Sequence, residues 1–183
     1  MYGRRGFSIG TSRKKGLEHK TMPLIEAITN LQQLKDRPAL AALLDWNHKA
    51  VVGAKFDHNE LSITIGREFI QDTCRALQKA GYNFLSDITC VDWYPSEPRF
   101  ELSYHLLSHR LKEYVRLHVR LTGNDAVIES IMPVWPSSNF FEREIFDLFG
   151  IQFTGRGPVN RIMMPDDWKG HPLRKDYPVE GYR

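Results

Sequence analysis

Two glutamates and one histidine near the C-terminus are the residues best suited to acid–base chemistry. Glu142 and Glu144 lie in the run FFEREIFDLFG, and His171 lies in GHPLRKDYP. A carboxylate and an imidazole within hydrogen-bond reach of a substrate can remove and return a proton. The sequence has no Ser/His/Asp order and no glycine-rich phosphate loop to complete a catalytic centre. A free-standing acid–base enzyme therefore remains only a distant alternative.

His105 and His109 have the HxxxH spacing of metal ligands on a helix. Strict alternation over residues 103–107 instead predicts a strand, in which four residues separate the two side chains by roughly 13 Å. Such side chains cannot share one ion. We interpret both as surface histidines at a strand end.

Cys74 and Cys90 are the only cysteines in the chain. They cannot supply the four thiolates of a cysteine-only zinc or iron–sulfur site, and they show no CxxC spacing. Both lie in apolar stretches, so we expect reduced, buried packing residues.

Length and composition favour one domain with extended arms. The chain has 183 residues, 42% of them hydrophobic, and can bury one sizeable core. Its net charge of +3 is concentrated in residues 1–22, which we interpret as a disordered basic arm. An organellar targeting peptide is the alternative interpretation. The rest is nearly neutral, so no nucleic-acid partner is expected. No apolar run approaches the roughly 20 residues that span a bilayer.

Apolar periodicity predicts an α+β fold. Helical spacing covers residues 24–34, with a second piece over 38–46, and residues 67–81, where Gly81 ends the helix. Strict alternation predicts further strands, joined by short turns, at residues 61–65, 82–93, 99–107, 114–121 and 126–132. We expect a mostly antiparallel meander with its helices on one face, within a domain of residues 23–149.

A charged helix is predicted to end this domain. Asn139 can cap its first turn, with Glu142 three residues later, and Gly150 follows its last turn. On a helical wheel Arg143, Glu144 and Asp147 lie opposite a broad apolar arc. Arg143 and Asp147 are four residues apart, so we expect a solvated pair between them.

Glu142 projects into the apolar arc, where a carboxylate must be paired or hydrogen-bonded. One interpretation is that it reaches back to the Asn139 N–H as a cap. The other is that the arc is an interface, and that Glu142 meets a donor on a second chain.

Residues 150–183 are predicted to form an extended tail. Nine glycines and prolines in this stretch prevent it from building a core, so we expect a partner surface to order it. Pro172 and Pro178 favour an extended backbone. Arg174 could pair with a partner carboxylate through its planar fork, whereas Lys175 could stay in water. The sizeable apolar anchors are Leu173 and Tyr177.

The runs FEREIFDLFGIQFTG and NRIMMPDDWKGHPLRKDYP resemble the signature of the 30-kDa subunit family of respiratory complex I, the NADH:quinone oxidoreductase. LSDITCVDW and FELSYHLLS resemble that family too, so the match covers most of residues 61–178. Residues 155–159 depart from the family pattern, and no contact is transferred to them. The matching positions, together with the anchor Tyr177, are predicted to face a partner: Glu142, Arg143, Glu144, Asp147, Arg161, His171, Leu173, Arg174, Lys175, Asp176 and Tyr177.

The resemblance implies a non-redox subunit of the peripheral arm, docked on the 49-kDa-type subunit near the site of quinone reduction. FMN, iron–sulfur clusters and quinone would be bound by partner subunits, and membrane contact would come only through the complex. The implied location is the cytoplasmic face of a bacterial inner membrane, or alternatively the matrix side of the mitochondrial one. Membrane-bound hydrogenases and ferredoxin- or F420-dependent oxidoreductases contain similar subunits and supply the closest alternative.

Overall fold

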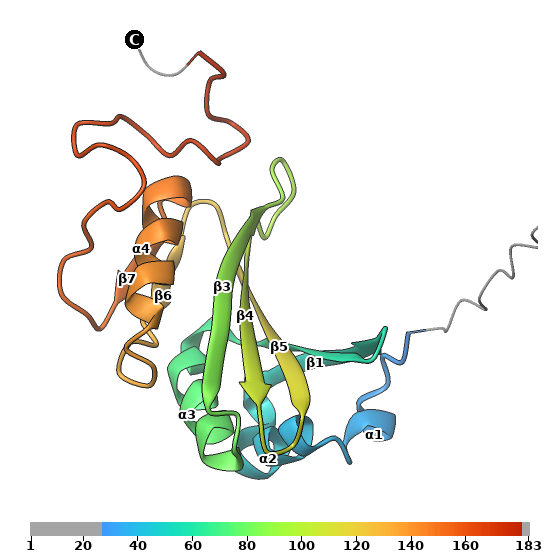
Figure 1. The fold of residues 1–183 in the computed structure, drawn as a ribbon. Helices are drawn as coiled ribbons and strands as arrows, with labels where there is room; N and C mark the ends of the chain where they lie inside the picture. Colours follow the sequence, from blue (N-terminus) through green and yellow to red (C-terminus); the bar gives the residue numbers. More distant parts are fainter. Residues whose placement is uncertain (1–26, 181–183) are drawn as a thin grey trace, which may run out of the picture.

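The computed structural model describes residues 27–180, so the predicted basic arm of residues 1–22 lies outside the described part. Figure 1 shows a sheet with short helices at one end and α4 beside β3. The elements, in chain order, are α1 (Leu31–Leu34), α2 (Pro38–Asn47), a 3₁₀ turn (His48–Ala50), β1 (Val51–Asp57), β2 (Glu60–Ile65), a 3₁₀ turn (Arg67–Phe69), α3 (Ile70–Ala80), β3 (Phe84–Asp92), β4 (Phe100–Ser108), β5 (Glu113–Leu121), β6 (Val127–Glu129), α4 (Ser138–Phe149) and β7 (Gln152–Thr154).

The main sheet has five strands in the order β1-β2-β5-β4-β3. Three of its neighbouring pairs are antiparallel, whereas β2 and β5 run parallel. The predicted α+β class with a mostly antiparallel sheet is confirmed. The meander is right for β3, β4 and β5, which follow one another through short turns.

Two parts of the meander prediction were wrong. Strand β1 was not predicted, because Gly53 and Lys55 interrupt its apolar alternation. The stretch 126–132 was predicted to extend the main sheet, but only Val127–Glu129 forms a strand. That strand pairs with β7 in a separate two-stranded parallel sheet, so residues after Gly150 belong to the folded part of the chain.

The predicted helix over residues 24–34 was also largely wrong within the described residues. Helix α1 begins only after Asn30, whose side-chain oxygen accepts a hydrogen bond from the Gln32 N–H at 2.9 Å. Ile28 instead pairs with Phe56 of β1 in an isolated bridge. Arg37 has an extended backbone because it precedes a proline, and this separates α1 from α2.

The core lies between one face of the sheet and the helices. Phe100, Leu102, Tyr104 and Leu106 alternate inward from β4 as predicted, and all four are fully buried. Ile70, Cys74 and Leu77 of α3 belong to the same cluster. Gly81 closes α3 in the left-handed conformation with φ 105°, which confirms the predicted stop.

Outside this core the sheet carries polar side chains. His105 lies in β4, as predicted, while His109 follows the strand and packs edge-on against Phe84. Cys74 is buried as expected, but Cys90 is only partly buried. Burial raises the pKa of the Cys90 thiol to about 12, with the Asp92 carboxylate adding to the shift.

Candidate functional site

Helix α4 begins earlier than the sequence predicts. Ser137 is its N-cap residue and makes no side-chain cap, so Asn139 lies inside the first turn and the predicted capping box was wrong. The helix ends at Gly150 as predicted, with φ 74° and an N–H that donates to the Phe146 carbonyl at 2.8 Å. A Cβ at Gly150 would lie 2.5 Å from the His171 ring, so this position requires glycine for space as well as for conformation.

Glu142 is completely buried, and its donors come from its own chain. Its carboxylate accepts hydrogen bonds from the Ser130 hydroxyl at 2.7 Å, the Ile131 N–H at 2.9 Å and the Ser138 hydroxyl at 3.1 Å. Arg156 adds an ion pair at 2.8 Å. Both interpretations of Glu142 are therefore wrong, because the carboxylate neither reaches back to Asn139 nor lies on an exposed interface.

Arg156 is the site residue that sequence reasoning missed. It belongs to the loop that departs from the family pattern, and its side chain is almost as buried as that of Glu142. A second guanidinium nitrogen donates to the Asn139 amide oxygen, while Nε has no hydrogen-bond partner among the described residues. An unpaired glutamate in an apolar arc was the available signal, but the loop has no periodicity that would place an arginine opposite it.

Asp147 binds the chain at the beginning of the tail. One carboxylate oxygen accepts from the N–H groups of Ile162, Met163 and Met164 at 3.0, 2.8 and 2.8 Å, and the other pairs with Arg161. Burial alone would raise the pKa of Asp147, but these hydrogen bonds, led by that of Met164, hold it below its ordinary value. This carboxylate therefore fixes three consecutive residues of an irregular segment.

The predicted pair between Arg143 and Asp147 does not form. Arg143 donates instead to the carbonyl oxygens of Asn160 at 3.0 Å and Arg161 at 2.7 Å. Asp147 is fully buried by the returning chain, whereas Glu144 stays exposed. A helical wheel could not show this, because the side it assigned to solvent is covered by residues 160–164.

His171, Leu173 and Arg174 cover the C-terminal end of α4. His171 donates through Nδ1 to the Asp147 carbonyl at 2.9 Å, and the Leu173 N–H donates to the Leu148 carbonyl at 3.0 Å. Arg174 donates to the Phe149 carbonyl. These groups satisfy carbonyls that a helix end leaves without partners, and the Arg174 cation suits the negative end of the helix dipole. The Arg174 fork is thus directed at a backbone carbonyl, not held free for a carboxylate as predicted.

Arg99 joins the tail to the sheet. Its guanidinium makes two hydrogen bonds to Asp92, at 2.9 and 2.8 Å, and two to Asp176, at 2.9 and 2.6 Å. The Lys175 N–H also donates to Asp92 at 2.9 Å. Burial opposes ionisation of Asp92, but hydrogen bonds from Arg99, Lys175 and Tyr94 lower its pKa to about 2.

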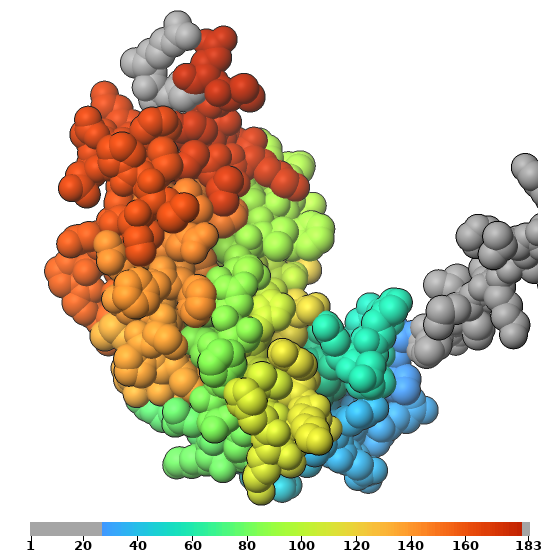
Figure 2. All heavy atoms as spheres, in the orientation of Figure 1, coloured from blue at the N-terminus to red at the C-terminus, as the bar shows by residue number. Residues whose placement is uncertain are grey.

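These contacts define a folded-back segment, residues 160–177, that lies against α4 and the end of β3 (Figure 1). The expectation that only a partner would order the tail is therefore corrected. In Figure 2 its red and orange-red atoms cover the end of the molecule next to the β3–β4 loop. The structure brings together ten of the eleven residues predicted to face a partner, leaving only Glu144 outside the contacts: Glu142, Arg143, Asp147, Arg161, His171, Leu173, Arg174, Lys175, Asp176 and Tyr177.

The acid–base arrangement considered from the sequence does not form. Glu142 is buried and saturated with donors, Glu144 is exposed, and His171 is bound to a helix carbonyl. Burial also lowers the pKa of His171. The structure therefore offers no shared position at which these three side chains could meet a substrate.

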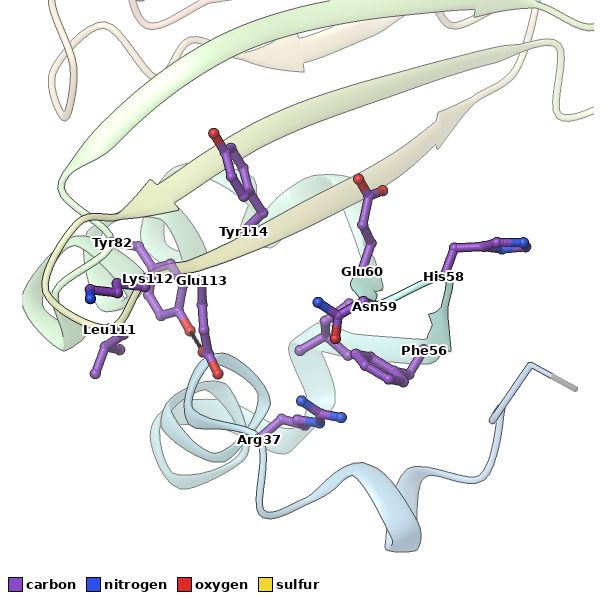
Figure 3. Close-up of a pocket in the computed structure, with 11 residues that line it drawn as sticks. Arg37, Phe56, His58, Asn59, Glu60, Tyr82, Leu111, Lys112, Glu113 and Tyr114 are labelled. Atoms are coloured by element: carbon purple, nitrogen blue, oxygen red, sulfur yellow. Dashed lines mark hydrogen bonds between the residues drawn. The ribbon is translucent and has the colours of Figure 1, made fainter. Parts of the chain in front are cut away.

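A hollow of about 470 Å³ lies elsewhere, between the β1–β2 turn and the β4–β5 turn (Figure 3). Glu113 there accepts a hydrogen bond from the Tyr82 hydroxyl at 2.8 Å, and Arg37 stacks on the Phe56 ring at 3.8 Å. None of the residues predicted to face a partner lines it. Within residues 27–180, no group of three histidine, cysteine or acidic side chains could hold a metal ion.

Comparison with known families settles what kind of chain carries this segment. The family model described as "Respiratory-chain NADH dehydrogenase, 30 Kd subunit" matches residues 63–183. This chain belongs to that family. The resemblance seen in the sequence is confirmed, and the chain is a complex I subunit of the NADH-quinone oxidoreductase type.

Similar proteins of the 30-kDa family come from several bacteria, and each is an NADH-quinone oxidoreductase subunit of the same type. The relative from Geobacter sulfurreducens is 44% identical over 124 residues, which cover 67% of this chain and 76% of that protein. The relative from Rhodobacter capsulatus is 41% identical over 135 residues, covering 72% of this chain and 67% of that one.

Solved structures share the fold of this 30-kDa subunit. A trypsin-resistant fragment (1–134) of Nqo5 superposes with a TM-score of 0.59 at 26% identity, covering 66% of this chain and 99% of the fragment. A chain of the membrane-bound sulfane sulfur reductase, an archaeal respiratory membrane complex, gives a TM-score of 0.66 at 24% identity. That match covers 76% of this chain and 82% of the archaeal one, and it shows the fold alone.

Proposed function

We propose that this 30-kDa subunit is a structural and assembly component of the peripheral arm of a proton-translocating NADH:quinone oxidoreductase. It docks on the 49-kDa-type subunit through the folded-back segment, near the site of quinone reduction. The subunit transfers no electrons itself; its task is to hold redox subunits in position.

The observation that carries this proposal is the exposure of apolar side chains on a segment whose backbone is already fixed. Met163 is 61% exposed and Leu173 52% exposed, and Ile162 and Trp168 are exposed nearby. The backbone beneath them is held by Asp147 and by the end of α4. A surface ordered before binding loses less conformational entropy on association, so such side chains are suited to enter a partner's pockets.

We also propose that FMN, iron–sulfur clusters and quinone are bound by partner subunits. Cys74 is buried in the core, and the thiol of Cys90 is kept protonated by burial, whereas a cluster ligand must be a thiolate. Within residues 27–180 no helix is long and apolar enough to span a membrane. Membrane attachment would therefore come through the complex, at the cytoplasmic face in a bacterium or the matrix face in a mitochondrion.

The test is a co-purification of the full chain with the 49-kDa-type subunit from the same source. Met163→Asp combined with Leu173→Asp places charges on exposed side chains and should abolish co-purification without lowering the melting temperature. Val52→Asp is the matched control, because Val52 is an exposed apolar residue at the far edge of the sheet. Normal assembly of the double variant would contradict the proposal.

The second candidate is the equivalent subunit of a membrane-bound hydrogenase or of a ferredoxin- or F420-dependent oxidoreductase. It is favoured by the fold shared with the archaeal respiratory complex. Mass spectrometry of the intact complex distinguishes the two, because flavin- and NADH-binding subunits accompany this chain only in the first.

A further inference from the structure

Three exposed apolar side chains lie where β3 ends, far in sequence from the folded-back segment. Trp93 is 44% exposed, Tyr94 47% and Val91 41%. We propose that these residues, here termed the aromatic edge, form a second contact site for the partner that binds the folded-back segment. This inference rests on the proposed function, and it adds a contact surface contributed by the sheet.

The aromatic edge and the folded-back segment are parts of one rigid unit. Asp92 lies between Val91 and Trp93, and its carboxylate turns inward to accept hydrogen bonds from Arg99 and from the Lys175 N–H. Asp176, the next residue of the segment, binds the same guanidinium at 2.9 and 2.6 Å. Figure 2 shows the two regions as neighbouring parts of the surface, with the red segment against the green β3–β4 loop. A partner that covers one therefore reaches the other without a rearrangement.

Both aromatic rings are held in place before binding. The Trp93 N–H donates to the Arg99 carbonyl at 2.7 Å, and the Tyr94 N–H donates to Asp92 at 2.9 Å. The guanidinium of Arg99 lies 4.9 Å from the centre of the Tyr94 ring, and that of Arg120 lies 5.7 Å from the Trp93 ring. Tryptophan, tyrosine and arginine are the residues that most often dominate binding energy at protein interfaces.

The geometry also indicates what the partner presents. The exposed ring of Trp93 requires an apolar depression, and the Lys175 side chain requires an acidic neighbour. Among residues 27–180 the Lys175 ammonium meets no carboxylate, although its backbone N–H is bound to Asp92. The occupant is therefore a protein surface with an apolar pocket and a carboxylate at its rim, on the same subunit that receives Leu173.

The experiment measures the dissociation constant between the full chain and the purified 49-kDa-type subunit. Trp93→Ala should weaken binding about 30-fold, as expected for a central aromatic contact. Trp93→Phe should restore most of that loss. Tyr114→Ala is the matched control, because Tyr114 is 60% exposed near the opposite end of the sheet, and it should change binding less than about twofold. Tyr94→Ala provides an independent reading if Trp93→Ala does not fold.

The outcomes separate this inference from the proposed function. If both aromatic variants bind like the wild type while Leu173→Asp prevents binding, the aromatic edge is overturned and the proposed function stands. If the wild-type chain does not bind the 49-kDa-type subunit, both are overturned. Self-association of the isolated chain that Trp93→Ala abolishes would also overturn the inference, since the occupant would then be a second copy.

Discussion

The Arg156 guanidinium lies 2.8 Å from the Glu142 carboxylate, and both side chains are almost completely buried. The glutamate comes from the first half of α4, and the arginine comes from a loop that departs from the family pattern. This pair holds the loop against the helix and so positions the start of the folded-back segment. Its role is internal, and that changes what substitution of Glu142 should do.

We predict that Glu142→Ala destabilises the isolated chain by about 3–5 kcal/mol, because it leaves the Arg156 charge buried without a partner. Urea unfolding of the purified chain measures the loss. Glu144→Ala is the control, since Glu144 is exposed on the same helix, and its effect should stay within about 0.5 kcal/mol. A stable Glu142→Ala chain that fails only in assembly would restore the interface interpretation.

Gly150→Ala should destabilise the chain by about 1–3 kcal/mol through its left-handed backbone alone. The added Cβ would also meet the His171 ring at 2.5 Å and the Arg174 guanidinium at 2.7 Å, so the folded-back segment must shift. Thermal unfolding and trypsin cleavage after Arg174 report the two effects. Gly157→Ala has open space around the new Cβ and should change neither; equal effects at both positions would disprove the packing explanation.

Attachment of the folded-back segment should weaken in acid. The pKa of Asp92 is about 2 in the folded chain, below its ordinary value of 3.8, and the pKa values of Asp147 and Asp176 are also lowered. A lowered pKa means that the unfolded state binds more protons, so this stabilisation is complete above about pH 4 and is lost as the pH falls toward 2. Unfolding free energies measured from pH 5 to 2 should therefore decline, and Asp92→Asn should reduce the slope. An unchanged slope in that variant would contradict the assignment.

Arg174 and Lys175 should differ although both are cationic. Arg174 donates to the Phe149 carbonyl and lies over the Phe100 ring at 5.3 Å, whereas the Lys175 side chain is exposed. Arg174→Lys cannot reproduce a planar stacked fork, so amide exchange around Leu173 and Tyr177 should accelerate in the isolated chain. Lys175→Arg should leave exchange there unchanged, and the reverse order would refute the contact.

Local patterns in the sequence predicted local structure well. The apolar stripe of α3 and the alternation of β4 and β5 each follow from one face that must be buried. The parallel pairing of β2 with β5 was not predictable in this way, because it joins strands that are far apart in the chain. Such a pairing leaves no mark on the periodicity of either strand.

Residue types are enough to find the candidate site, but they do not identify its partners. The segment after Gly150 is charged and unable to form a core, as its composition predicts. Its partners within the chain, such as Asp92 and Arg99, lie more than 70 residues upstream. Short-range rules therefore treat Asp92 as a turn residue and Asp147 as a solvated helix residue, because no such rule links a carboxylate to a returning loop.

Hydrogen exchange on the full chain, free and bound to the 49-kDa-type subunit, tests the central claim most directly. A prefolded docking segment predicts that the amides of Ile162, Met163, Met164 and Lys175, which donate to Asp147 and Asp92, are already protected in the free chain. Protection across residues 160–177 should then increase on binding. Fast exchange of these amides in the free chain, or exchange across the segment that does not slow in the complex, would contradict the claim.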